Sequence, residues 1–131
     1  MALHVLTALA YRKGETLTST ELAGSVGTNP AFLRTVLGRL KAAGLIEVNL
    51  GKGGGARLGR EPEAITLEDI YNALEEGPAM HKHACTAAMC QVARGMGPVL
   101  AALEADVNAA VRTRLAQKTV ADVLGQVGQH P

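Results

Sequence analysis

Apolar residues recur at steps of three and four in six stretches of this chain, a spacing that places side chains on one face of an α-helix. We therefore predict helices over residues 2–12, 19–26, 30–43, 67–76, 98–118 and 120–127. A further stretch, Leu45–Leu50, alternates only partly and is rich in strand-forming residues, so we predict a strand there, with residues 56–59 as its hairpin partner. The chain is thus expected to be mainly α with a small β-hairpin.

Polar residues at the starts of two neighbouring helices predict a helix-turn-helix. Thr18, followed three residues later by Glu21, has the pattern of a capping box. Asn29 is expected to cap the next helix, with Pro30 at its first position, and Gly27 ends the helix before it. The second helix has an apolar face and, opposite it, small or hydrogen-bonding side chains that suit the major groove of DNA.

The tip of the predicted hairpin is rich in glycine, with the sequence Gly51-Lys52-Gly53-Gly54-Gly55. Glycine has no side-chain bulk, so such a tip can approach a phosphate backbone or a minor groove closely. A helix-turn-helix followed by a basic, glycine-tipped hairpin is the layout of a winged-helix DNA-binding domain. A nucleotide-binding loop is not favoured, because neither a strand–GxGxxG–helix context nor a P-loop lysine motif is present.

Positive charge is concentrated in the first half of the chain. Residues 1–60 hold eight basic and three acidic residues, a balance of +5, whereas residues 61–131 hold five basic and nine acidic residues, a balance of −4. A basic half suits a polyanionic partner, and an acidic half does not. The first half is therefore the expected DNA-binding part.

Other classes of protein are disfavoured by the sequence. No stretch approaches the roughly 18–20 apolar residues of a membrane span, and the short apolar run at residues 2–10 lacks the basic start of a signal peptide. Two cysteines without an export signal favour reduced thiols and a cytoplasmic location. No nucleophile–base–acid arrangement is recognisable, so an enzyme is not expected.

The stretch that begins at Pro98 has the pattern of a long amphipathic helix. Its apolar stripe consists of Val99, Leu103, Val107, Val111 and Leu115. Such a helix outside a small DNA-binding unit is most simply a dimerisation helix, because one winged helix contacts too short a site for high affinity; covering its own core is the alternative. We expect a winged-helix domain at residues 1–78, a Cys/His-containing sensor segment at 79–97, and the dimerisation and C-terminal helices at 98–131.

Several blocks of this chain, in the same order, resemble one bacterial family. The blocks Gly27–Arg34 and Leu40–Ile46 resemble the recognition-helix region of the Rrf-two-type regulators, which include IscR, NsrR and CymR. Residues 51–59 resemble their wing, and residues 66–70 and 119–124 resemble the helix after the wing and the terminal segment. The resemblance implies a homodimeric transcription factor, usually a repressor, which binds a palindromic operator in double-stranded DNA.

The resemblance places base reading on the predicted recognition helix. The residues expected to contact DNA are Thr28, Asn29, Ala31, Arg34, Thr35, Lys41, Lys52, Gly53, Gly54, Arg57 and Arg60. Arg34 is the candidate for a bidentate contact to guanine, which discriminates between bases by about 1–3 kcal/mol, and a phosphate contact is the alternative. Arg39 lies near the inward boundary and is expected to be structural. Leu50 stands where some family members carry a wing arginine, a role that Lys52 or Arg57 could take here.

The recognisable reactive group in the sequence consists of His81, His83, Cys85 and Cys90. As a redox switch, the two cysteines would form a disulfide within the chain or across a dimer, with the neighbouring Lys82 and histidines favouring the thiolate. This interpretation predicts a non-helical segment near Cys85. As a zinc site, the four residues have suitable ligand types, although they lack a recognised finger spacing.

An iron–sulfur cluster is the third interpretation of this group. The cluster-binding members of the family use three cysteines in this region, so a cluster here would need further ligands such as His81, His83 or His4 of the partner subunit. The alternative without a sensing role is that Cys85 and Cys90 are small buried residues and the histidines lie in a solvated turn.

The sequence therefore predicts a homodimeric transcriptional regulator, most simply a repressor, which responds to a redox or related signal through Cys85 and Cys90. An iron–sulfur-dependent regulator of the same family is the alternative. A winged-helix module that binds protein rather than DNA is the alternative from another class, and salt-dependent binding to duplex DNA separates the two classes.

Overall fold

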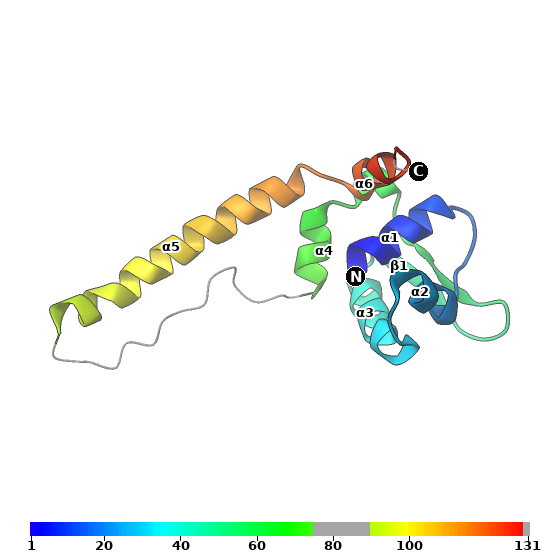
Figure 1. Cartoon of the computed structure of the whole chain (residues 1–131), viewed down its shortest axis with the longest axis horizontal. Helices are drawn as coiled ribbons and strands as arrows, with labels where there is room; N and C mark the ends of the chain where they lie inside the picture. The colour runs from blue at the N-terminus through cyan, green and yellow to red at the C-terminus, as the bar shows by residue number, and fades with distance from the viewer. Residues whose placement is uncertain (75–89, 130–131) are drawn as a thin grey trace. The chain divides into compact units, whose positions relative to one another are not determined.

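The computed structural model describes residues 1–74 and 90–129 (Figure 1). The chain divides into two units, one formed by Met1–Glu75 with Leu115–Pro131 and the other by Glu76–Arg114. The first unit holds α1 (Ala2–Tyr11), α2 (Ser19–Val26), α3 (Pro30–Ala42), β1 (Ile46–Asn49), β2 (Gly55–Leu58), the short 3-10 helix η1 (Pro62–Ala64), α4 (Leu67–Leu74) and α6 (Val120–Val127). The predicted winged-helix fold, mainly helical with a two-stranded hairpin and a long helix near the C-terminus, is confirmed.

The predicted capping residues define the helix-turn-helix. Thr18 Oγ1 accepts a hydrogen bond from the Glu21 backbone N–H (3.1 Å), and the Glu21 carboxylate accepts one from the Thr18 N–H (2.8 Å). The bond from the Thr18 backbone is the main reason that the pKa of Glu21 lies below its ordinary value. Asn29 caps α3 by accepting from the Phe32 N–H (2.8 Å). Gly27 ends α2 with a φ of 81°, which glycine adopts without steric cost.

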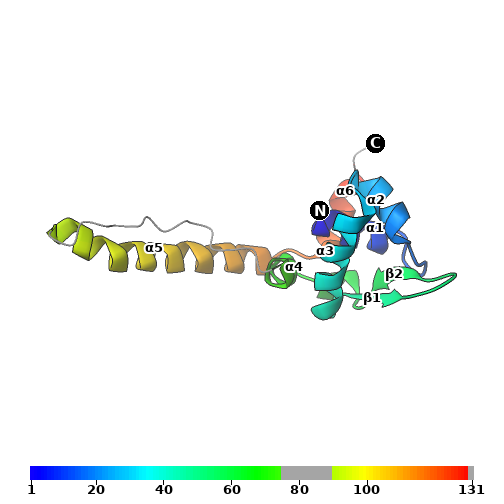
Figure 2. The same ribbon diagram turned by 90° about the horizontal axis from the view of Figure 1, so that it is seen from below.

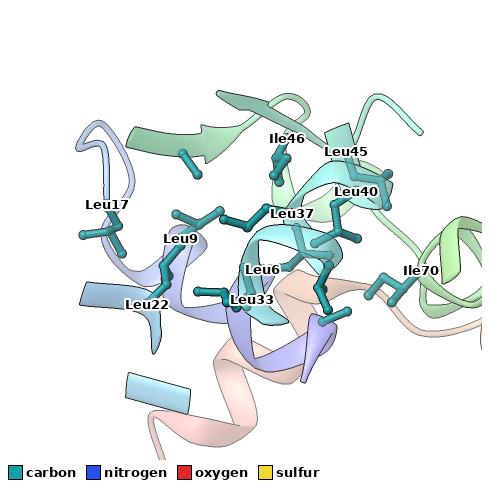
Figure 3. Close-up of a cluster of buried hydrophobic side chains, with 14 of the residues drawn as sticks. Leu6, Leu9, Leu17, Leu22, Leu33, Leu37, Leu40, Leu45, Ile46 and Ile70 are labelled. Carbon is teal, nitrogen blue, oxygen red and sulfur yellow. The ribbon is translucent and has the colours of Figure 1, made fainter. Parts of the chain in front are cut away.

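Helix α3 packs into the core through one face. Its residues Leu33, Val36, Leu37 and Leu40 are buried. Around them lie aliphatic side chains from the other elements, as Figure 3 shows for Leu6, Leu9, Leu17, Leu22, Leu45, Ile46 and Ile70. None of the three aromatic residues of the chain is buried. Close packing of the inner face holds the outer face of α3 in a defined position.

The hairpin forms a wing beside the helices. Strands β1 and β2 pair antiparallel, with Ile46 opposite Leu58 and Asn49 opposite Gly55. Leu17, in the segment before α2, exchanges two backbone hydrogen bonds with Ala56 (2.9 and 2.8 Å) and so anchors the wing to the helix-turn-helix. Figure 2 shows that the loop between the strands projects away from the helices.

The C-terminal segment closes onto the winged-helix unit. The Leu67 N–H donates to the Lys118 carbonyl and the Val120 N–H donates to the Ile65 carbonyl, both at 2.9 Å. Helix α6 then packs against α1. The domain division expected from the sequence placed α6 with the long helix, whereas these backbone bonds join it to the first unit. Backbone pairing between segments about fifty residues apart leaves no periodic signal in the sequence.

Helix α5 runs from Gln91 to Ala116 and contains Pro98. The sequence pattern instead predicted that this helix begins at Pro98. Proline removes one backbone N–H and is common in a first turn, which made it a plausible start. Here the helix begins seven residues earlier, directly after Cys90, and the Arg94 N–H donates to the Cys90 carbonyl (3.0 Å). No helix in the described part of the chain is long and apolar enough to span a membrane.

Candidate nucleic-acid interface

A groove of about 360 Å³ lies on the winged-helix unit between α3 and the wing. We call it the α3–wing groove. It is lined by Thr18, Ser19, Arg34, Leu37, Gly38, Lys41, Val48, Asn49, Leu50, Gly51, Gly54, Gly55 and Ala56. Two of these residues are basic and none is acidic. The groove therefore presents positive charge beside hydrogen-bonding groups, which is what a DNA backbone and base edges require.

The cations of α3 point out of the core. Arg34 and Lys41 are exposed on the helix whose opposite face is buried. In the described residues, neither forms an ion pair with an acidic side chain, and the same holds for Lys52 at the wing tip. These three side chains can thus meet an external anion without first breaking an internal pair.

The other predicted arginines of the interface are already engaged. Arg57 forms a cross-strand ion pair with Glu47, with Nη2 2.8 Å from the carboxylate. Arg60 lies 3.8 Å from Asp69 and donates to the Ala43 carbonyl at 3.5 Å. Exposed pairs of this kind contribute little to stability, so DNA could displace the carboxylates. In this conformation, however, Arg57 and Arg60 are less available to a phosphate than Arg34.

The start of α3 holds the remaining helix candidates. Ala31 and Thr35 are exposed, and Thr28 is half-buried in the turn. The Asn29 side-chain oxygen is used by the helix cap, so this residue has a structural role that a base contact would have to share. Small exposed residues at these positions leave room for a base pair to approach the helix closely.

Glycine is required at the wing tip by the backbone itself. A Cβ atom on Gly54 would lie 2.2 Å from the Asn49 carbonyl oxygen, and Gly53 has a φ of 78°. The Gly54 N–H donates to the Gly51 carbonyl at 3.0 Å and closes the loop. The glycine-rich sequence therefore encodes a defined turn that carries Lys52.

Two residues outside the predicted set of DNA contacts have defined surroundings in the structure. Arg39, expected to be structural, donates from Nη1 to the carbonyl of Leu74 (2.9 Å), which ends α4. Leu50, not counted among the predicted DNA contacts, is 92% exposed and lines the α3–wing groove. The sequence placed Leu50 at the end of the predicted strand, so its pattern alone did not distinguish it from a buried strand residue.

The proposed sensor residues are only partly covered by the structure. His81, His83 and Cys85 lie outside the described residues, as does the predicted non-helical segment near Cys85. Cys90 is an exposed free thiol in the protomer and lies directly before α5. His4 is exposed on α1, with Nε2 3.0 Å from Ser25 Oγ. The described residues hold no group of three potential metal ligands.

The predicted dimer stripe lies on α5. Val99, Leu103 and Val107 are exposed, whereas Val111 and Leu115 are half-buried. No residue of this 26-residue helix is buried. An amphipathic helix without a buried residue has apolar surface for which a partner would provide cover.

Comparisons with known proteins establish the family. The sequence matches the family model Rrf2, described as an iron-dependent transcriptional regulator, over residues 1–126. The chain belongs to the Rrf2 family of transcriptional regulators. YwnA of Bacillus subtilis, an HTH-type transcriptional regulator by name, is 29% identical over 130 residues, which cover 97% of this chain and 94% of YwnA. IscR of Cereibacter sphaeroides is 37% identical over 76 residues, which cover 56% of this chain and 49% of IscR.

Solved structures share the fold of this Rrf2-family chain. A transcriptional-regulator structure from Lactobacillus plantarum has a TM-score of 0.84 at 24% identity, over 98% of this chain and 88% of that one, and it supports the fold. CymR, the global cysteine regulator of Bacillus subtilis, has a TM-score of 0.70 at 25% identity, over 95% of this chain and 91% of CymR. The Rrf2-family chain is accordingly a DNA-binding transcriptional regulator and not an enzyme.

Proposed function

We propose that this Rrf2-family protein represses transcription as a homodimer, which binds a palindromic operator through α3 and the wing of each protomer. The observation that carries this proposal is the α3–wing groove, which is lined by Arg34 and Lys41 and by no acidic side chain. The groove beside Arg57 and Arg60, by contrast, is also lined by Glu15, Glu47 and Glu61. Because no acidic side chain of its lining offsets its positive charge, the α3–wing groove is favoured as the surface that contacts phosphate.

Within this proposal, the residues of α3 and the wing have different tasks. Arg34 lies in the first half of α3 and reaches a guanine edge through its planar guanidinium. Lys41 and Lys52 neutralise phosphates on either side of the groove and set the register without reading sequence. Two such sets in a symmetric dimer would match two half-sites about one helical turn apart.

The dimer is supported by the apolar stripe of α5. Burial of a leucine or valine side chain is favourable, and a second copy of the chain could bury those that are exposed in the protomer. Three stripe residues, Val99, Leu103 and Val107, are at least 36% exposed. Symmetric pairing through this stripe would fix two recognition helices in one particle, as a palindromic operator requires.

For the signal, we propose thiol oxidation through Cys85 and Cys90. Cys90 is exposed and directly precedes α5, so a change at its sulfur acts at the start of the proposed dimerisation helix. In the reaction, two thiols give up two electrons and two protons to hydrogen peroxide, which forms two waters as the disulfide forms. An iron–sulfur cluster remains the alternative signal, and Cys90 would then be a ligand.

Replacing Arg34 by alanine tests how the operator is read. We expect Arg34→Ala to weaken binding to a duplex selected by the wild-type protein by about tenfold to a hundredfold, and to reduce preference at the base pair it reads. Lys52→Ala is the matched control: it should weaken binding to all sequences equally and lower the slope of the salt dependence by about 0.9 for each phosphate it no longer neutralises. Equal weakening on every sequence by Arg34→Ala would make Arg34 a phosphate contact instead.

Replacing Cys90 by serine tests the proposed signal. Hydrogen peroxide should change the DNA affinity of the wild-type protein by about tenfold, and Cys90→Ser should lose this response while binding DNA normally. Adding dithiothreitol should return the DNA affinity of the oxidised wild-type protein to its starting value. A Cys90→Ser protein that still responds to peroxide would exclude this thiol as the sensor.

Protein purified without oxygen separates the thiol switch from the metal alternatives. A colourless, metal-free preparation supports thiol oxidation. Visible absorption with stoichiometric iron and sulfide would support the cluster in its place, and stoichiometric zinc would support the zinc site.

A further inference from the structure

The wing carries a large apolar side chain that the fold leaves in water. Leu50 is 92% exposed, more than any other large hydrophobic residue in the described part of the chain. A single exposed leucine on a protein surface is ordinary and needs no explanation by itself. The position of Leu50 sets it apart, because it lies directly before the glycine-rich tip of the wing and lines the α3–wing groove.

The backbone at Leu50 is constrained by the loop that follows it. It directly follows the end of β1 at Asn49 and precedes Gly51, whose φ is 96°. Gly54 packs so closely beneath this corner that a Cβ atom there would lie 2.2 Å from the Asn49 carbonyl oxygen. The loop is closed by a backbone hydrogen bond from Gly54 to Gly51, which constrains the backbone from which the leucine side chain projects.

Leu50 also faces the same groove as the free cations of α3. It lines the α3–wing groove together with Arg34 and Lys41. Lys52, two residues further along the tip, is exposed as well. An apolar group that is flanked by unpaired positive charges and by glycine is placed to enter a groove of DNA while its neighbours hold the phosphates.

We infer that Leu50 is an apolar wedge, which enters the minor groove and partly unstacks a base step beside the bases that α3 reads. Leucine is one of the side chains that proteins insert between base pairs, and insertion kinks the duplex. Pyrimidine–purine steps such as TA and CA/TG unstack most easily. Leu50 thus confers a preference for such a step under the wing, through the deformability of DNA and not through hydrogen bonds. This inference rests on the proposed DNA-binding function.

The test uses a duplex selected by the wild-type protein from a randomised library, with aminopurine placed in turn at each step near the wing. Wild-type binding should raise aminopurine fluorescence at one pyrimidine–purine step, because the base loses its stacking. Leu50→Ala should abolish this rise and weaken binding by about tenfold, which is in the range that one specific interaction with DNA contributes. The salt dependence should stay unchanged, since leucine carries no charge.

Two further variants serve as controls for the wedge. Leu50→Met keeps a long apolar side chain and should retain both the fluorescence rise and the affinity. Lys52→Ala should lower affinity and salt dependence while the fluorescence rise persists. Because Leu50 is outside the core, all of these variants should keep the wild-type thermal midpoint.

Wild-type affinity and fluorescence in Leu50→Ala would overturn the wedge and leave the proposed function intact. Loss of dimerisation by Leu50→Ala without DNA, measured by sedimentation, would assign the side chain to contact between copies and also overturn it. A wild-type protein that selects no duplex at all would overturn the proposed function, and the wedge with it.

Discussion

Val107→Asp is expected to convert the proposed homodimer into monomers. Val107 is the middle residue of the apolar stripe on α5, a helix in which no residue is buried. An unpaired carboxylate in an apolar interface loses its hydration without a compensating partner, and the dimer dissociation constant should rise by at least about a hundredfold. Sedimentation equilibrium measures this change, and binding to a two-half-site duplex should weaken in parallel.

Ala105→Asp is the matched control for this variant. Residue 105 is on the same helix and is exposed, but it lies about 160° around the helix axis from Val107. The substitution places the same charged side chain on the same helix but outside the stripe, so the dimer should persist. A dimer that survives Val107→Asp would place the interface elsewhere on the chain.

Gly54→Ala is expected to lower DNA affinity by at least about tenfold. The new Cβ atom would lie 2.2 Å from the Asn49 carbonyl oxygen and 2.9 Å from the Gly51 carbonyl oxygen. Both atoms belong to the backbone, so the loop itself must move, and with it Lys52 and Leu50. Fluorescence anisotropy with a labelled duplex measures the loss, which corresponds to about 1.4 kcal/mol or more of binding free energy.

Gly24→Ala separates this effect from glycine replacement in general. Gly24 lies inside α2, and a Cβ atom there meets nothing within 4 Å. Alanine in a helix interior stabilises the helix by roughly 0.5–1 kcal/mol relative to glycine. The thermal midpoint of this variant should therefore rise slightly, and its DNA affinity should stay at the wild-type value. Normal DNA binding by Gly54→Ala as well would show that the wing tip takes no part in recognition.

The sequence predicted the local structure well where the signal is itself local. Thr18 with Glu21, and Asn29 directly before Pro30, mark helix starts because each cap bond joins residues three positions apart. The four glycines of the tip likewise marked a turn through their own backbone freedom.

Features that depend on distant residues were beyond the sequence pattern. The pairing of Arg57 with Glu47 arises only when the two strands lie side by side, and that of Arg60 with Asp69 when α4 folds back toward the wing. Residue type alone made both arginines resemble free phosphate contacts. The early start of α5 was hidden because the segment from Gln91 to Gly97 has no capping signal and precedes a proline.

The exposure of Leu50 also became clear only in the folded chain. From the sequence, it continues an apolar alternation with Ile46 and Val48, so it could equally end a buried strand face. The structure ends β1 at Asn49, and Leu50 stands beyond the ladder at 92% exposure. The predicted strand included Leu50, and a boundary one residue earlier leaves this leucine outside the strand and in the lining of the α3–wing groove.

The salt dependence of binding to a selected duplex tests the central claim most directly. If Lys41 and Lys52 of both protomers contact phosphate, a plot of the logarithm of the association constant against that of the salt concentration should have a slope of about −3.6 or steeper. The slope should flatten when either lysine is replaced by alanine. Binding without salt dependence, or no duplex binding at all, would contradict the account and favour a winged-helix module that binds protein.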